Sequence, residues 1–225
     1  MTPDPTAMAP DPQETVADAL ARQVGAGQGP SANILVGALR ELGAVDRAVY
    51  EAVARTPTAT LDGPVRGLSA AANHSRLWLG IAAAVALVGG ERGRRAALEG
   101  VVAIGVTSAA VNLGVKPIAR RGRPDRAGPG RFEDRHVPMP GSASFPSGHA
   151  ASAFAFAYAV GRHLPALAVP IRLLAAAVAY SRVHTGVHYP GDVVIGSVTG
   201  AGTAAMVAAV ADRVGRSRPP SGRAR

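Results

Sequence analysis

The chain has 225 residues, 48% of them hydrophobic and only 4% aromatic, so its apolar content is mainly alanine, valine and leucine. Cysteine is absent, which excludes disulfide bonds and thiolate metal sites. The net charge is +9, but no basic stripe is interleaved with aromatic residues, so we expect no nucleic-acid partner. The basic residues instead flank apolar stretches, as they do around membrane spans, and the expected partner is a lipid bilayer.

The first 65 residues are expected to precede the membrane domain. Residues 1–31 are rich in proline, aspartate, glycine and alanine, which predicts a disordered tail. Residues 32–65 carry apolar side chains at helical spacing, interrupted by charges, and predict an amphipathic interfacial segment. Residues 1–75 hold eight acidic residues and five arginines, so the excess of positive charge lies in the rest of the chain.

Five apolar stretches then predict an all-α, multi-span transmembrane bundle of about five spans; a water-soluble alanine-rich bundle is the alternative. Only the last stretch clearly reaches the length of about 18 to 20 residues expected for a span. In it, Gly196 and Gly200 form a GxxxG pair, which permits close approach of another helix. Residues 213–225 form a basic tail. The stretches are Leu77–Gly90, Gly100–Val115, Ala150–Gly161, Leu164–Tyr180 and Val193–Ala211.

The arginines between these stretches predict an orientation in the cell membrane. Arginines between the first two stretches, around the turn before the fourth and after the fifth belong to the cytoplasm by the positive-inside rule. Alternation then places residues 116–149 and 181–192 together on the extracytoplasmic face. Arginines between 120 and 135 argue for the reverse orientation, but we assign some of them to substrate binding. We interpret Arg120 and Arg121 as interfacial or headgroup contacts.

Three short motifs carry the chemistry. They are Lys116–Pro124 (KPIARRGRP), Pro146–His149 (PSGH) and Ser181–Asp192 (SRVHTGVHYPGD). Together they supply cationic side chains, two histidines, a serine, a glycine and a carboxylate, which suits binding a phosphate dianion and attacking its phosphorus with an imidazole. Lys116 is the only lysine in a chain with 23 arginines, and a general preference for arginine does not explain this exception.

The order K-x6-RP, PSGH, SR-x5-H-x3-D resembles the type 2 phosphatidic acid phosphatase superfamily. This superfamily includes lipid phosphate phosphatases, polyprenyl diphosphate phosphatases and soluble vanadium haloperoxidases. The motifs match over residues 116–192, and the apolar stretches extend the likeness to a membrane domain of residues 66–212. The resemblance implies the helical core of these enzymes and hydrolysis of a lipid phosphate or diphosphate through a phosphohistidine, with neither metal nor other cofactor.

The resemblance also implies the catalytic roles of three residues. His188 matches the nucleophile, whose neutral imidazole attacks phosphorus. Asp192 would accept the other ring N–H of that histidine and stabilise its developing positive charge. His149 matches the general acid that protonates the leaving oxygen and then activates water.

The remaining motif residues match groups that bind the phosphate. Lys116, Arg123 and Arg182 would donate to its non-bridging oxygens. Ser147 and the backbone N–H of Gly148 would add donors, at the start of a helix whose dipole favours an anion. Ser147 also has a simpler interpretation as a helix cap.

A zinc site is a rival interpretation of the third motif. His184, His188 and Asp192 recur at intervals of four residues, which on a continuous helix would align three metal ligands. Pro190 and Gly191 argue against such a helix. The zinc site would also leave the lysine, the arginines and the second histidine without a role.

The class of lipid stays open between polyprenyl diphosphates, polyprenyl-linked phosphosugars and phosphatidic acid. The outward-facing site and the composition favour the two polyprenyl classes. Two other functions remain as alternatives: a soluble vanadium haloperoxidase-like enzyme, and a non-catalytic membrane protein that binds lipid phosphates. A degraded motif would indicate the latter, and none of the motif residues is missing.

Overall fold

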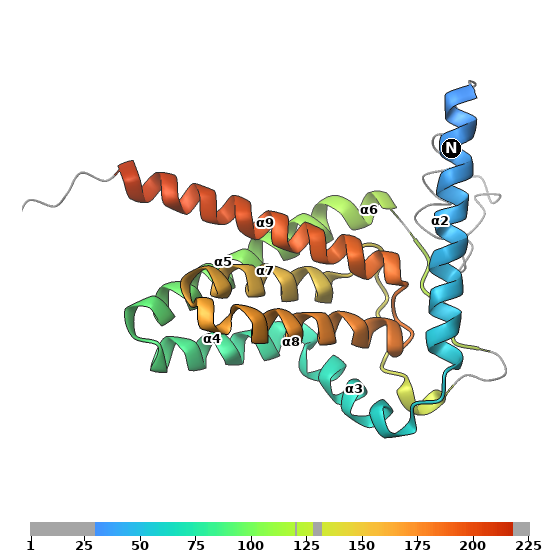
Figure 1. Cartoon of the computed structure of the whole chain (residues 1–225), viewed down its shortest axis with the longest axis horizontal. Helices are drawn as coiled ribbons and strands as arrows, with labels where there is room; N and C mark the ends of the chain where they lie inside the picture. Colours follow the sequence, from blue (N-terminus) through green and yellow to red (C-terminus); the bar gives the residue numbers. More distant parts are fainter. Residues whose placement is uncertain (1–29, 120, 128–131, 218–225) are drawn as a thin grey trace, which may run out of the picture.

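The computed structural model of this chain describes residues 30–119, 121–127 and 132–217, and the regular elements in these ranges are helical (Figure 1). The all-α prediction is therefore confirmed for them. The longer helices are α2 (Pro30–Arg55), α3 (Ala59–Ala71), α4 (Arg76–Val88), α5 (Gly90–Ala109), α7 (Gly148–His163), α8 (Pro165–His184) and α9 (Pro190–Ser217). The short elements are η1 (Asn73–Ser75), the π-helical turn η2 (Ala110–Val115), α6 (Lys116–Ala119) and η3 (Glu133–Arg135).

Each of the five apolar stretches forms a helix, namely α4, α5, α7, α8 and α9. The tail expected over residues 1–31 lies outside the described residues, except for its last two, which begin α2. Residues 213–217, expected to belong to a basic tail, continue α9, and the rest of that tail also lies outside the described residues.

Helix α7 forms the centre of the bundle and packs against α5, α8 and α9. Its alanines are almost completely buried, and its Phe156 packs against Trp78 of α4 with ring centroids 5.5 Å apart. Because alanine side chains are short, the neighbouring helices can approach α7 closely.

The GxxxG pair of α9 faces α7, as the sequence predicts. A Cβ atom at Gly196 or Gly200 would overlap a backbone carbonyl of α7 or its cap, from Ser147 and Ala151 respectively. Only glycine allows this contact without moving one of the helices. The contact holds the beginning of α9 against the beginning of α7, which carry two of the three motifs.

The described helices do not confirm the expected number of about five membrane spans. Three helical segments are long and apolar enough to cross a membrane: Gly90–Ala119, Pro165–His184 and Pro190–Ser217. A fourth crossing requires α3 and the η1–α4 segment, which meet at a bend of 65°, to count as one span. Helix α7 has 16 residues, fewer than the roughly 20 of a typical span, and is enclosed by its neighbours. The described helices thus support three or four spans.

The outer faces of the bundle are apolar. Large hydrophobic side chains point away from the protein on several of the long helices, where water would be an unfavourable solvent. Together with the apolar helices, this surface indicates a membrane protein. Examples are Leu87 on α4, Leu98 on α5, Leu173 on α8, and Val198 and Met206 on α9.

Helix α2 lies across one end of the bundle, at a steep angle to the long helices (Figure 1). Its Tyr50 is buried and meets Tyr189, just before α9, edge to face with ring centroids 5.4 Å apart. Near the end of α2, Arg135 of η3 donates to the carbonyls of Val53 (3.2 Å) and Thr56 (2.6 Å). The segment expected to be amphipathic is therefore packed onto the loops at this end of the protein.

Candidate active site

The second and third motifs meet at the bundle end that α2 crosses. Ser147 is the N-cap of α7, and its hydroxyl accepts a hydrogen bond from the N–H of Ala150 at 3.4 Å. Its own backbone N–H donates to the carbonyl of Asp192 at 3.0 Å. The N–H of Gly148 belongs to the first turn of α7, where backbone donors have no partner within the helix and are available to an anion.

His188 lies in the loop between α8 and α9 and is almost fully buried. Its Nδ1 lies 3.3 Å from Oδ2 of Asp192, while its Nε2 lies 3.4 Å from Nη1 of Arg123. Burial lowers the pKa of His188 to about 4, although the nearby Asp192 opposes this shift. The ring is therefore neutral at pH 7, with Asp192 at one nitrogen and a cation at the other.

Asp192 is held from several directions. Its Oδ1 accepts from Nη1 of Arg121 at 2.5 Å, and its Oδ2 accepts from the hydroxyl of Ser144 and, at 3.0 Å, from the N–H of Tyr189. Arg121 is itself buried and donates to Oδ2 of Asp46, on α2, at 2.8 Å. These contacts keep the carboxylate ionised and oriented toward His188.

The burial of Arg121 corrects the interpretation of this residue as an interfacial or headgroup contact. Its guanidinium lies over the ring of Tyr189, 4.0 Å from the centroid, between the carboxylates of Asp46 and Asp192. The adjacent Arg120 lies outside the described residues.

Arg123 and Lys116, from the first motif, approach the other two motifs through the loop before α7. Arg123 donates to the carbonyls of Ser142 (3.0 Å) and Val187 (2.6 Å), and burial lowers its pKa to about 10, so it remains charged at neutral pH. Lys116 donates from Nζ to the hydroxyl of Ser142 at 3.3 Å. Its ammonium also lies beside Gly148, 3.9 Å from where a Cβ would be.

Arg182, near the end of α8, is buried below His188, whose N–H donates to the Arg182 carbonyl at 3.1 Å. Its Nη1 donates to the hydroxyl of Ser69 at 2.5 Å. Its Nε is buried and has no hydrogen-bond partner among the described residues. A buried guanidinium N–H without a partner is a donor that a phosphate oxygen would satisfy.

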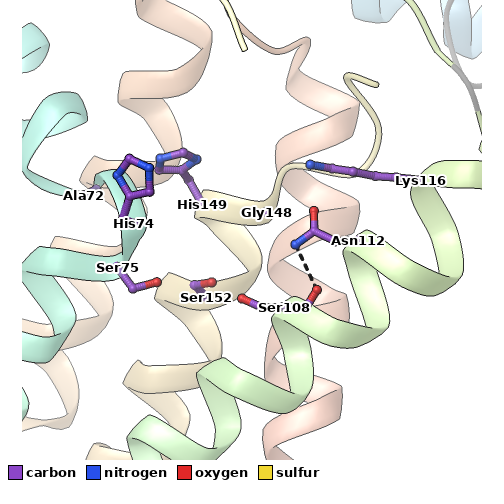
Figure 2. Close-up of a pocket in the computed structure, with 9 residues that line it drawn as sticks. All are labelled: Ala72, His74, Ser75, Ser108, Asn112, Lys116, Gly148, His149 and Ser152. Atoms are coloured by element: carbon purple, nitrogen blue, oxygen red, sulfur yellow. Dashed lines mark hydrogen bonds between the residues drawn. The ribbon is translucent and has the colours of Figure 1, made fainter. Parts of the chain in front are cut away.

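His149, in the first turn of α7, has a partner that the sequence did not indicate. Its Nε2–H donates to Oδ1 of Asn73 in η1 at 2.9 Å. His149, Gly148 and Lys116 line a cavity of about 190 Å³, shown in Figure 2. His188, Arg123 and Arg182 do not line this cavity, which therefore lies on the His149 side of the site.

The third motif does not form the aligned set of metal ligands that the zinc hypothesis needs. His184 lies 2.9 Å from Oδ1 of Asp62, on α3, and 3.3 Å from the hydroxyl of Tyr180. Within the residues that the structure describes, no three histidine, aspartate or glutamate side chains converge as a metal site would require. His184 instead ties α8 to α3.

Four residues at this site were missed or misinterpreted from the sequence. Arg121 is one of several arginines in a basic segment, and Ser144 precedes the PSGH motif without belonging to it. Asp46 and Asn73 are more than 70 positions from their partners Arg121 and His149. No local pattern links such distant residues, because only tertiary packing brings them together.

Comparison with known proteins shows which family the chain resembles. The model of the PAP2 superfamily matches residues 96–216. Decaprenylphosphoryl-5-phosphoribose phosphatase of Mycobacterium tuberculosis (strain ATCC 25618 / H37Rv) is 36% identical over 153 residues, covering 68% of this chain and 80% of that protein. The protein with the same name from Mycolicibacterium smegmatis is 38% identical over 153 residues, covering 66% and 77%.

Two solved structures share the fold. LpxE of Aquifex aeolicus superimposes with a TM-score of 0.61 at 19% identity, over 73% of this chain and 95% of LpxE. A transmembrane PAP2 type phosphatidylglycerolphosphate phosphatase from Bacillus subtilis gives a TM-score of 0.60 at 22% identity, over 90% and 97%. With the family match and the sequence relatives, they lead to one conclusion: the chain belongs to the PAP2 superfamily.

Proposed function

We propose that the protein is an integral membrane phosphatase that hydrolyses a lipid phosphate through a phosphohistidine at His188. The observation that carries this proposal is the pairing of His188 with Asp192 at Nδ1 and with Arg123 at Nε2. A buried neutral imidazole with an oriented carboxylate at one nitrogen is a nucleophile at the other. The cation beside Nε2 marks where a phosphate would lie.

In the first step, Nε2 of His188 attacks phosphorus and the bond from phosphorus to the leaving oxygen breaks. Asp192 accepts the Nδ1–H and stabilises the positive charge that develops on the ring. Arg123, Arg182 and Lys116 neutralise the non-bridging oxygens, with help from donors at the start of α7. Burial lowers the pKa of His149 to about 3 when no phosphate is bound, so we propose that its proton arrives with the phosphate, whose negative charge stabilises the imidazolium. His149 then protonates the leaving oxygen, which departs as an alcohol.

In the second step, water replaces the alcohol. His149, now neutral, removes a proton from this water, and the oxygen attacks the phosphohistidine. The bond between phosphorus and Nε2 breaks, inorganic phosphate leaves, and His188 returns to its neutral form. In both steps, the side chains of Lys116, Arg123 and Arg182 would supply the positive charge that stabilises the phosphate.

For the substrate we propose a polyprenyl-linked phosphosugar. The relatives that are 36 to 38% identical carry the name decaprenylphosphoryl-5-phosphoribose phosphatase. Polyprenyl diphosphates and phosphatidic acid are the competing substrates. A panel of these three lipids in detergent, with phosphate release as the readout, tests the proposal.

The experiment on mechanism compares the wild-type protein with His188→Ala. We expect the variant to remain folded in detergent and to release no phosphate. Rapid acid-free quenching with a radiolabelled substrate should trap an acid-labile phosphoprotein in the wild type only. Full activity of His188→Ala would refute the assignment of the nucleophile.

We also propose that the site opens on the extracytoplasmic face, because the arginines of the α4–α5 turn, of the end of α7 and of the end of α9 lie at the opposite end of the bundle. Arginines also lie at the site end, but Arg121, Arg123, Arg126 and Arg135 are bound to other groups of the protein there. The absence of cysteine from the chain allows a direct test. Gly141→Cys, in the loop before α7, should react with a membrane-impermeant maleimide in intact cells. Arg92→Cys, in the first turn of α5, should react only after lysis, and the reverse pattern would invert the orientation.

A further inference from the structure

Three serine hydroxyls and an asparagine amide face the cavity beside His149, and the mechanism above does not use them. Ser75 comes from η1, Ser152 from α7, and Ser108 and Asn112 from α5 and η2. Figure 2 shows the three serines in a row along one side of the cavity, with Asn112 between them and Lys116. Four polar groups from three separate parts of the chain therefore converge beside the general acid.

These hydroxyls are not satisfied by the protein. Other hydroxyls in the long helices bond to the carbonyl four residues earlier, as Ser197 and Thr203 do at 2.8 Å. Among the described residues, the side chains of Ser75, Ser108 and Ser152 have no such partner, although Ser152 is buried. Hydroxyl groups without partners are unfavourable in a membrane protein, so their convergence on one cavity indicates a ligand that forms hydrogen bonds.

Asn112 is also oriented toward this cavity. Its Nδ2 donates to the carbonyl of Ser108 at 2.9 Å, so this amide hydrogen bond fixes the side chain. The residue belongs to a π-helical turn, an irregularity that often occurs at functional sites because it redirects side chains.

The position of the cavity matches that of a leaving group. In-line displacement at phosphorus requires the leaving oxygen to lie opposite the nucleophile. The cavity is lined by the general acid His149 and by Lys116, but not by His188. A phosphate between the two histidines would therefore direct its leaving oxygen toward the cavity.

The size and charge of the cavity select among leaving groups. Its volume of about 190 Å³ is room for several waters, which suits a small ring. A diphosphate would present a second anionic group there, yet Lys116 is the only lysine or arginine in the lining. A phosphatidic acid would present ester oxygens, which accept hydrogen bonds but donate none, so it would pair fewer of these polar groups than a sugar would.

We infer that this cavity binds the neutral, polyhydroxylated sugar ring of the leaving group, and that Ser108, Asn112 and Ser152 determine the preference for it. This inference rests on the proposed function. When the phosphorus–oxygen bond breaks, the oxygen takes its proton from His149 and becomes one more sugar hydroxyl. The polyprenyl tail, attached elsewhere on the sugar, stays outside the cavity.

The test measures kcat/KM in detergent for a polyprenyl-linked phosphosugar, a polyprenyl diphosphate and phosphatidic acid. We expect the wild type to prefer the phosphosugar by at least about tenfold, since each hydroxyl contact contributes about fivefold. Ser108→Ala/Ser152→Ala should lose about twentyfold on the phosphosugar and little on the other two lipids. Asn112→Ala, at an exposed position, should show the same selective loss if the double variant folds poorly.

Ser197→Ala is the matched control, because its hydroxyl bonds within α9, away from the cavity; it should change none of the three values. An equal loss on all three lipids, or no loss, would overturn the inference while leaving the phosphatase function intact. A wild-type preference for either of the other lipids would do the same. If the wild type released phosphate from none of them, the proposed function itself would fail.

Discussion

Arg121 and Asp192 form a buried ion pair in which Nη1 of the arginine lies 2.5 Å from Oδ1 of the carboxylate. The second Nη of Arg121 reaches Asp46 on α2, and the other carboxylate oxygen of Asp46 accepts from the N–H of Gly191 at 2.7 Å. Helix α2 thus supports both the side chain that orients Asp192 and the turn that carries it. It does so from outside residues 96–216, where the family match lies.

We expect Asp46→Ala to lower kcat by about tenfold, because losing one partly buried partner of a charged pair costs on the order of 1–3 kcal/mol. The loss should appear in kcat more than in KM, since Asp46 lies behind Arg121 and would not touch the substrate. Asp46→Asn, which keeps one acceptor oxygen, should recover part of the activity. Phosphate-release kinetics measure both values.

Glu41→Gln is the control for this prediction, because Glu41 is an exposed carboxylate on the same helix. It should have wild-type kinetics. Equal kinetics for Asp46→Ala and Glu41→Gln would show that α2 does not position the site.

Lys116→Ala should lower kcat/KM by about ten- to a hundredfold, the range for losing a charged hydrogen bond to phosphate. The ammonium lies at the junction of the cavity and the start of α7, where no other lysine can replace it. Arg76→Ala removes an exposed cation at the start of α4 and should have little effect. Similar losses in the two variants would mean that Lys116 contributes only to the general positive charge.

Acidification should destabilise the folded protein through His188. Burial lowers the pKa of this residue to about 4, while the unfolded chain binds the proton near the ordinary value of 6.5. Between these values the unfolded state holds more protons, so the free energy of unfolding falls as the pH falls through this window. From pH 7.5 to 5 the loss is about 2 kcal/mol at 1.36 kcal/mol per pKa unit.

Thermal unfolding of the wild type and of His188→Asn in detergent, at pH 7.5 and 5, measures this contribution. The variant is expected to be less stable at neutral pH but to lose less on acidification, since it has no imidazole at this position. An equal loss in both proteins would show that His188 is not held in the neutral form.

Chelation should leave the activity intact. In the proposed mechanism, the positive charge that a phosphate requires would come from Lys116, Arg123 and Arg182. His184 is hydrogen-bonded to Asp62 rather than turned toward His188 and Asp192. Phosphate release should therefore be unchanged by EDTA. Activity that disappears with EDTA and returns with added zinc would restore the metal hypothesis.

The sequence predicted the helical class, the five apolar helices and the close contact at Gly196 and Gly200. The expected number of about five spans is not confirmed, because hydropathy measures how apolar a helix is and not what surrounds it. Helix α7 is apolar because neighbouring helices enclose it, and its 16 residues are too few for a typical span. By length and composition, the described helices support three or four crossings.

The sequence by itself determined the candidate reactive groups and their order, since His188 and Asp192 are four residues apart and the chain between them brings them together. Tertiary structure alone decided which groups support them. Arg121 and Asp46 are 75 residues apart, and His149 and Asn73 are 76 apart. Such pairs form only when helices pack, because no local backbone geometry relates residues at that separation. The packing also turned Arg121 from an apparent surface cation into the buried partner of Asp192.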